Sequence, residues 1–212
     1  MFTTHENNLE LFVYIQTMLK EKGRVQKSGS NTIRFIIGNI EGIKLFIFTI
    51  HNKLRTPNKN ESLNNLIDFI NKKYNLAIPF SVLDESDFSK NSWFTGFTEV
   101  DGHFGVKIVE AKSKSDTRKR SVSNSISLKF RLDQQYIEKL NRESGAPGIP
   151  SGAGESNLNI MEKLANFLDC KLSIYNNKTG KVLSLNVTSL EKVRFVVNYF
   201  NQYPLLGIRN KM

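Results

Sequence analysis

The side chains with the most chemistry to offer in this sequence are basic, and they recur at alternate positions of one segment. From Ser125 to Asp133, polar or charged residues alternate with Ile, Leu and Phe. Such alternation is typical of an antiparallel strand with one buried face and one exposed face. Lys129 and Arg131 fall on the exposed face, and these residue types make many of the protein contacts to nucleic-acid phosphates. The segment therefore predicts a cationic sheet surface.

The charge of the whole chain points the same way. Its 212 residues include 30 Lys and Arg against 20 Asp and Glu, which gives a formal net charge of +10 and a pI near 9.6. A chain this cationic suits a polyanion or an anionic membrane surface. No apolar run is long enough to span a bilayer. We therefore expect nucleic acid as the partner, and no membrane.

The sequence gives little indication of a disulfide, a metal site or a phosphate-binding loop. Cys170 is the single cysteine, so it cannot form an internal disulfide, and a reducing compartment fits this composition. The three histidines are scattered along the chain and give no metal-ligand spacing. The Gly/Pro/Ser-rich stretch 145–155 lacks the Lys-Ser/Thr ending of a phosphate-binding loop, so we interpret it as a connecting loop.

Periodicity predicts a mixed α+β chain that positions these basic faces. Helical spacing of apolar residues indicates helices at 8–21, 41–52, 61–74, 91–100, 157–168 and 189–203. Alternation indicates strands at 24–28, 32–37, 103–110, 125–133, 171–175 and 182–188. From about residue 91 the order is αββαββα, and the first part of the chain repeats only the last four of these elements. A basic segment 53–59, with Pro57 inside it, is expected to be a linker.

One segment resembles the motif that names the LAGLIDADG family of homing endonucleases and intron maturases. It is Phe94-Thr-Gly-Phe-Thr-Glu-Val-Asp-Gly-His-Phe104, with Gly96 where the family's helix interface needs a small residue and Asp101-Gly102 where the helix closes. The stretch 195–209 resembles the family's third helix with its Pro-Leu ending, and Lys53-Leu-Arg-Thr-Pro57 resembles the matching part of a first repeat. The resemblance covers nearly the whole chain.

This resemblance implies a domain organisation. Residues 1–59 would be a partial first repeat that lacks its motif helix and the two strands after it. Residues 60–90 would be a linker with a short helix, and 91–212 a full repeat with its motif at 94–104. In the family, each repeat forms a four-stranded antiparallel sheet that curves into half of a saddle over the DNA major groove.

The resemblance also implies site residues. Asp101 would be the catalytic ligand of Mg²⁺, with the backbone carbonyl of Val100 as its neighbour, and metal-activated water would attack a phosphodiester. The residues expected to contact nucleic acid lie on the sheet and on the loop 112–120; they are Lys107, Lys112, Lys114, Arg118, Lys119, Arg120, Lys129, Arg131, Tyr175, Ser184 and Asn186.

Two functions follow, and both stay open. Because the chain carries one motif, we expect a former nuclease that binds organellar RNA without cleaving it, either an intron or a structural RNA of a ribonucleoprotein, in the mitochondrial matrix or in another organelle with its own genome. The alternative is a Mg²⁺-dependent double-strand DNA homing endonuclease assembled as a dimer. Phe94 and Phe97 are expected to leave an uncovered apolar face on the motif helix, for a second copy, a partner protein or residues 76–82. Val100 is expected to crowd that interface, since the family places Ala or Gly there.

Overall fold

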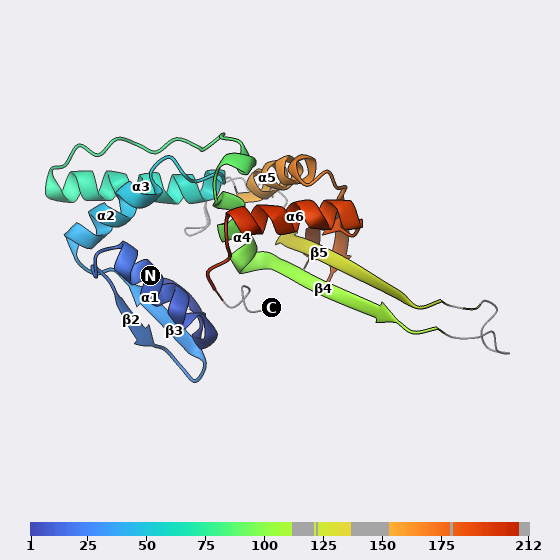
Figure 1. The fold of residues 1–212 in the computed structure, drawn as a ribbon. Coiled ribbons are helices and arrows are strands. Elements are labelled where there is room, and N and C mark those ends of the chain that lie inside the picture. The colour runs from blue at the N-terminus through green and yellow to red at the C-terminus, as the bar shows by residue number, and fades with distance from the viewer. Residues whose placement is uncertain (112–120, 122, 137–152, 179, 208–212) are drawn as a thin grey trace. The chain divides into compact units, whose positions relative to one another are not determined.

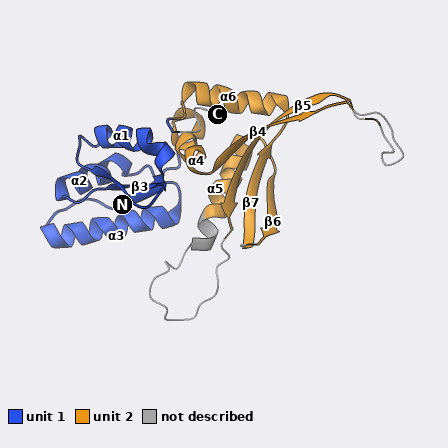
Figure 2. Ribbon diagram, turned by 90° about the horizontal axis from the view of Figure 1, so that it is seen from below, with its two compact units in different colours: residues 1–86, 141–156, 206–212 blue, residues 87–140, 157–205 orange. Residues whose placement is uncertain are grey.

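The protein forms two compact units, shown in different colours in Figure 2. The computed structural model describes residues 1–111, 121, 123–136, 153–178 and 180–207. Unit 1 comprises residues 1–86 with 141–156 and 206–212, and unit 2 comprises 87–140 with 157–205. Each unit contains its own antiparallel sheet, which confirms the mixed α+β class.

Unit 1 contains a three-stranded sheet in the order β1-β3-β2. Its strands are β1 (Phe2–His5), β2 (Arg24–Lys27) and β3 (Thr32–Ile36). Gly29, at φ +98°, makes the turn between β2 and β3. The pattern predicted β2 and β3 but missed β1, because four residues hold too little alternation to stand out from a loop. The expectation that residues 1–59 lack both strands that follow the missing motif helix was therefore wrong, because β1 precedes the first helix.

Two helices cover one face of this sheet. They are α1 (Leu9–Met18) and α2 (Ile40–Ile50), and a 3-10 turn (Glu6–Asn8) precedes α1. Phe12 on α1 packs against Phe35 on β3, with 5.9 Å between ring centroids. The Asn39 side chain accepts a hydrogen bond from the Gly42 amide at 2.6 Å and so caps the first turn of α2.

The expected basic linker at 53–59 is confirmed only for residues 53–56, because a helix begins at Pro57. Helix α3 (Pro57–Tyr74) begins at Pro57, where proline costs nothing because the first amide of a helix has no intrahelical partner. Ile67 of α3 packs against Ile47 of α2. The chain then returns beside α3, since Asn64 accepts from the Ser81 amide at 2.7 Å. Residues 76–82, one of the three alternatives for covering the motif helix, therefore pack within unit 1.

Unit 2 contains a four-stranded sheet in the order β4-β5-β7-β6, with every neighbouring pair antiparallel. The strands are β4 (Gly102–Val109), β5 (Ser125–Gln135), β6 (Leu172–Asn177) and β7 (Gly180–Val187). This confirms the predicted four-stranded antiparallel sheet. Gly180, at φ +127°, begins β7 directly after the turn from β6.

Three helices cover one face of the unit 2 sheet: α4 (Trp93–Asp101), α5 (Ala153–Phe167) and α6 (Leu190–Gln202). A 3-10 turn (Phe88–Lys90) precedes α4. Leu183, Leu185 and Val187 of β7 are fully buried beneath the helices, as their alternation predicted. Helix α5 begins at Ala153, inside the stretch expected to be a loop. The Ser189 hydroxyl accepts from the Lys192 amide at 3.3 Å and caps α6.

The hairpin of β4 and β5 extends beyond the helices (Figure 1). β5 pairs with β7 only from Phe130 onward, so the distal part of β5 pairs with β4 alone. There the apolar side chains Val106 and Ile126 are 67% and 72% exposed. The predicted burial of the apolar face was therefore wrong for this distal part, because none of the described helices lies over it.

The two units share part of one topology. Unit 1 runs strand, helix, strand, strand, helix from β1 to α2, and unit 2 runs through the same sequence from β5 to α6. The strand orders correspond as well, since β1-β3-β2 matches β5-β7-β6. Among the described residues, unit 1 has no counterpart of α4 or β4. The organisation as a partial repeat followed by a full repeat stays a prediction.

Candidate nucleic-acid interface

The sheet face of unit 2 that lies opposite the helices carries the polar side chains. In the strand register, Arg131 of β5 lies directly between His103 of β4 and Asn186 of β7. One step outward along β5, Lys129 lies opposite Gly105. Residues directly opposite in a sheet share a face, with Cβ atoms about 5 Å apart. The register therefore brings together side chains that the sequence assigned separately.

Lys107 extends the same face along β4, where it lies opposite Ser127. Its side chain is exposed, and the Lys129 side chain is half-buried. Neither amine has an ion-pair partner within the described residues. Lysines with no carboxylate partner are suited to hold phosphate oxygens as point charges.

Arg131 differs from these lysines because it is paired on its own strand. Its Nε donates to Asp133 Oδ1 at 2.8 Å, and its Nη2 lies 2.7 Å from Asp133 Oδ2. Its Nη2 also donates to the Tyr175 hydroxyl at 2.5 Å, and the guanidinium carbon lies 5.5 Å from the centre of the Tyr175 ring. Asp133 was not among the predicted site residues. Its position two residues from Arg131 on the same strand face was the available signal.

The pKa values of this pair shift in the directions that mutual stabilisation requires. Burial alone would raise the pKa of the Asp133 carboxyl, but hydrogen bonds from Arg131 and Ser184 outweigh burial and lower it. The hydrogen bond to Asp133 raises the pKa of Arg131. Both groups are therefore charged at neutral pH, and their charges cancel locally.

Ser184, a predicted contact residue, is 1% exposed and is buried on the sheet. Its hydroxyl donates to Asp133 Oδ1 at 2.6 Å and accepts from Asn186 Nδ2 at 3.0 Å. Ser184 therefore influences the surface through Asp133 and Asn186. Beside this cluster the face is hollowed where Gln135 and Asn177 border Val182.

The motif helix ends beside the same sheet. Asp101, the last residue of α4, is half-buried, and its Oδ2 accepts from Gln134 Nε2 at 2.6 Å. Gly102 lies so close to α4 that an added Cβ would be 2.7 Å from the Thr98 carbonyl oxygen. The motif glycine at this position is therefore explained by packing within the chain. The sequence did not predict the contact between Gln134 and Asp101, because the two residues lie 33 positions apart.

Asp101 offers one carboxylate that suits Mg²⁺. Carboxylate oxygen is a ligand that Mg²⁺ prefers, and the ion is commonly held by one or two carboxylates together with water and phosphate oxygens. In the described part of the chain, no group of three or more His, Cys, Asp or Glu side chains gathers as a metal site. Asp101 and the Val100 carbonyl therefore stay predicted ligands that need further oxygen donors.

The exposed face of the motif helix is not the one that the sequence predicted. Phe94 is 0% exposed and packs against Phe130 and Phe200, with ring centroids 5.8 and 5.5 Å away. The expected uncovered Phe94 face was therefore wrong, because this ring is a centre of the core. Gly96 and Val100 are exposed instead, and Val100, at 71% exposure, causes no crowding within this chain.

Unit 1 has a polar sheet face that the sequence did not single out. Thr3 of β1, Arg34 of β3 and Gln26 of β2 lie directly opposite one another, and all three are exposed. Ile33 and Phe35 are buried on the other face of this sheet. The alternation of β3 was the signal that would have placed Arg34 on this surface.

Some predicted contacts cannot be placed on either face. Lys112, Lys114, Arg118, Lys119 and Arg120 lie outside the described residues.

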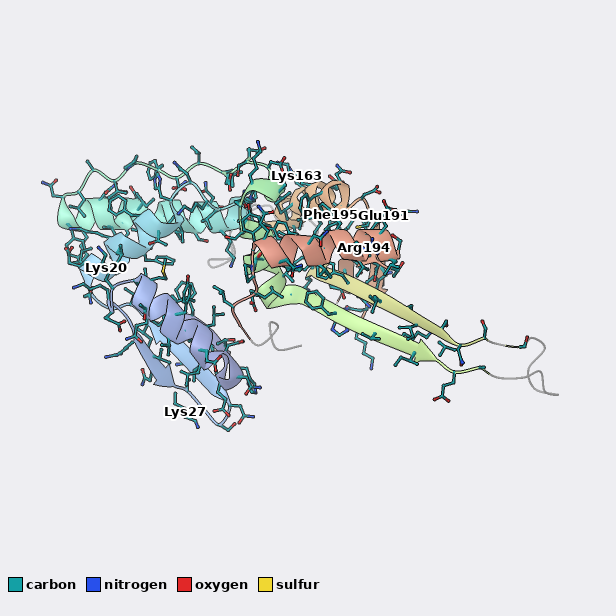
Figure 3. All side chains as sticks on the ribbon, viewed as in Figure 1. Lys20, Lys27, Lys163, Glu191, Arg194 and Phe195 are labelled. Atoms are coloured by element: carbon teal, nitrogen blue, oxygen red, sulfur yellow. The ribbon has the colours of Figure 1, made fainter. Side chains whose placement is uncertain are left out.

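The helical layer of unit 2 also carries charged side chains, as Lys163 on α5 and Glu191 and Arg194 on α6 show (Figure 3). Within the described segments, no helix is both long enough and apolar enough to cross a membrane.

A family comparison agrees with this fold and motif. The family model described as LAGLIDADG endonuclease matches residues 94–212. This match spans more than half of the chain, and it begins at the first residue of the motif. The protein therefore belongs to the LAGLIDADG endonuclease family.

Two curated relatives match along most of this chain. An uncharacterised cox1 intron-2 37.2 kDa protein of Schizosaccharomyces pombe is 27% identical over 208 residues, which cover 96% of this chain and 53% of that protein. The intron-encoded DNA endonuclease aI3 of Saccharomyces cerevisiae is 26% identical over 219 residues, which cover 96% of this chain and 51% of that protein. The chain thus spans about half the length of these relatives.

Solved structures share the fold at lower identity. Meganuclease I-SmaMI bound to uncleaveable DNA superposes with a TM-score of 0.66 at 17% identity, covering 99% of this chain and 74% of the other. LAGLIDADG meganuclease I-AabMI bound to uncleaved DNA gives a TM-score of 0.66 at 19% identity, covering 99% and 76%. These likenesses establish the fold.

Proposed function

We propose that this chain binds duplex DNA through the open face of its unit 2 sheet and that, by itself, it does not cleave the duplex. The observation that carries the proposal is the open face of unit 2. Lys107, Lys129, Arg131 and Asn186 lie together there, on the side opposite the helices. Side chains that a sheet presents in this way can contact the major groove, where base edges are distinguishable.

Duplex DNA is favoured over RNA by two considerations. The similar solved structures named above are described as bound to DNA. A-form RNA also has a deep, narrow major groove that side chains cannot read. Intron or structural RNA, which the sequence favoured, is the competing ligand and is an outcome of the test below.

The absence of cleavage rests on the donor set. Asp101 is the one acidic residue that the motif places at the end of its helix, and Gln134 already donates to it at 2.6 Å. Hydrolysis by paired metal ions needs ligands for both ions around the scissile phosphate. A second chain that contributes another motif carboxylate would complete such a site.

Binding is tested by titrating the purified chain against random-sequence duplex DNA and against structured RNA over a range of salt concentrations. Lys107→Ala with Lys129→Ala should lower the slope of log K against log salt by about 2, since each phosphate contact contributes roughly 0.9. Lys72→Ala with Lys73→Ala, on α3, is the matched control and should leave the slope unchanged. An unchanged slope in the sheet variant, or binding to RNA alone, would overturn the proposal.

Cleavage is tested separately with supercoiled plasmid and a large excess of Mg²⁺. The wild-type chain should produce neither nicked nor linear DNA. If nicks appear and Asp101→Asn abolishes them, the chain is an active nuclease and the non-cleaving part of the proposal is wrong. Nicks that persist in Asp101→Asn would point to a contaminating nuclease, which a mock purification would also reveal.

The proposed origin of the chain follows from its relatives. Two of them are named as cox1 intron-2 and intron-encoded proteins. We therefore propose that this chain also derives from an intron and acts in an organelle with its own genome, the mitochondrion. Fractionation of the source cells with an antibody to the chain tests this, and recovery in the cytosolic fraction alone would refute it.

A further inference from the structure

The cluster around Asp133 separates two tasks on the open face of unit 2. Lys107 and Lys129 carry charges without partners among the described residues, whereas the charge of Arg131 is matched by a carboxylate on its own strand. Affinity that comes from counterion release depends on net positive charge delivered to phosphates. A neutralised arginine contributes little to that term, so its presence on this face needs another explanation.

Asp133 has no capacity left to contact a ligand itself. A carboxylate offers about four acceptor positions. Oδ1 accepts from Arg131 Nε at 2.8 Å and from the Ser184 hydroxyl at 2.6 Å. Oδ2 accepts from Arg131 Nη2, at 2.7 Å, and from the Tyr175 hydroxyl at 3.3 Å. All four positions are therefore used, and Asp133 acts on the surface by holding its neighbours.

The direction of every hydrogen bond in the cluster is determined. The Tyr175 hydroxyl accepts from Arg131 and so donates to Asp133. The Ser184 hydroxyl accepts from Asn186 Nδ2 and so donates to Asp133. Stacking on the Tyr175 ring further restricts the guanidinium. Arg131 and Asn186 are thus fixed before any ligand arrives, which lowers the entropy cost of binding.

Two groups remain available at the surface of this cluster. Arg131 Nη1, which bears two N–H bonds, has no hydrogen-bond partner in the described segments. The Asn186 side-chain carbonyl also has no donor there, and Asn186 lies directly opposite Arg131 in the register. Guanine presents two adjacent acceptors, N7 and O6, in the major groove, and arginine is its commonest partner.

We propose that Arg131 and Asn186 form a preorganised site that reads one guanine-containing step of duplex DNA, with Asp133 as the positioning residue. The proposal rests on the proposed function, because it needs the open face of the sheet to meet the major groove. It assigns selectivity to the paired arginine and salt-dependent affinity to the unpaired lysines.

The test is selection from a pool of duplex DNA with a randomised central stretch, using the full chain and three variants: Arg131→Lys, Asp133→Asn, and Arg131→Ala combined with Asp133→Asn. Wild type should enrich a sequence with a fixed guanine at one position. Arg131→Lys keeps the charge but loses the planar fork, and Asp133→Asn keeps the shape but loses the carboxylate. Both should lose preference at that one position by roughly tenfold or more, with the other positions retained.

Salt titrations on the enriched sequence separate base reading from phosphate binding. Replacing both members of the pair, Arg131→Ala with Asp133→Asn, removes no net charge and should keep the wild-type salt slope, whereas Lys107→Ala should lower that slope by about 1. Equal slopes for wild type and this double variant, together with the lost guanine, would support the proposal. If the double variant lowers the slope and keeps the guanine, Arg131 holds phosphate and the proposal is wrong.

Each of the other possible outcomes contradicts a particular part of the proposal. If Asp133→Asn is folded, as thermal melting would reveal, and keeps both the guanine and the slope, Asp133 is not a positioning residue. Failure of wild type to enrich any duplex would refute the proposed function, and this inference with it. An enriched sequence that is indifferent to every Arg131 and Asp133 variant would overturn this inference alone.

Discussion

Replacing Phe94 by Ala tests which face of the motif helix is buried. The ring is 0% exposed and has ring neighbours on a strand and on two other helices. Centroid distances are 5.8 Å to Phe130, 5.8 Å to Phe167, 5.3 Å to Tyr199 and 5.5 Å to Phe200. Core Phe→Ala changes typically cost 3–5 kcal/mol. Four aromatic neighbours cannot easily collapse into the cavity, so we expect about 4 kcal/mol.

Urea unfolding followed by Trp93 fluorescence measures this cost, because Trp93 is the only tryptophan and lies on the same helix. With a denaturant slope near 2 kcal/mol per molar, the midpoint should fall by about 2 M. Val100→Ala is the matched control on the exposed face of α4 and should change stability by less than about 0.5 kcal/mol. If Phe94→Ala costs less than about 1 kcal/mol while Val100→Ala costs more, the helix is turned the other way and the packing argument fails.

Further predictions concern glycine packing and pH. Gly102→Ala should destabilise the chain by about 1–3 kcal/mol, because its Cβ would meet Thr98 Cγ2 at 2.4 Å, and a urea midpoint equal to wild type would contradict this. Gly96→Ala has open space in the isolated chain and should stabilise α4 by up to about 1 kcal/mol, so a loss in the same assay would mean that a neighbour fills that space. Asp84 and Asp133 have pKa values lowered in the folded state, so their contribution to stability should be complete above the unfolded pKa of about 3.9 and be lost as the pH falls from there through the lowered folded-state pKa. Urea midpoints from pH 7 to pH 3 measure this, and Asp133→Asn should flatten the acid part of the curve.

Periodicity predicted the elements whose burial is regular. The strand β7 alternates in residue type from Leu183 to Val187, and Leu183, Leu185 and Val187 are buried as that alternation requires; Ser184, which it predicts to be exposed, is buried as well. The motif helix was found from a contiguous segment, Phe94 to Phe104, in which residue type and order are both informative. Both patterns lie within one short segment of the sequence, so they can be recognised from the sequence alone.

The sequence did not predict which face of the motif helix is buried. Phe94 and Phe97 are both large and apolar and lie three positions apart, so helical spacing alone places them on one face. The structure separates them, because Phe94 enters the core while Phe97 stacks on Trp93 at its border, with centroids 4.9 Å apart. That distinction depends on the sheet and helices that arrive later in the chain. Strand β1 could not be predicted for a related reason. Its four residues carry no clear pattern, and they form a strand because they pair with β3.

The candidate site was predictable in its residue types and not in its pairings. Lys129 and Arg131 look equivalent in the sequence, since both are basic and share one strand face. Tyr175 and Ser184 reach Asp133 only because β6 and β7 pair in one particular register. A shift by one residue would turn these side chains to the other face. No property of the separate segments specifies that register.

Net charge and local pairing therefore have different consequences for this protein. The formal charge of +10 determines how strongly the surface attracts a polyanion, and salt weakens that attraction whatever the sequence of the ligand. Hydrogen bonds from a fixed guanidinium depend on where acceptors lie on a base edge, and salt affects them far less. The carboxylate of Asp133 slightly lowers the attraction to a polyanion, because it removes net charge. It strengthens hydrogen bonding by Arg131 to a base edge, because it fixes the direction of the guanidinium. An acidic residue on a cationic sheet is thus consistent with nucleic-acid binding, and it marks the part of the surface where selectivity is to be sought.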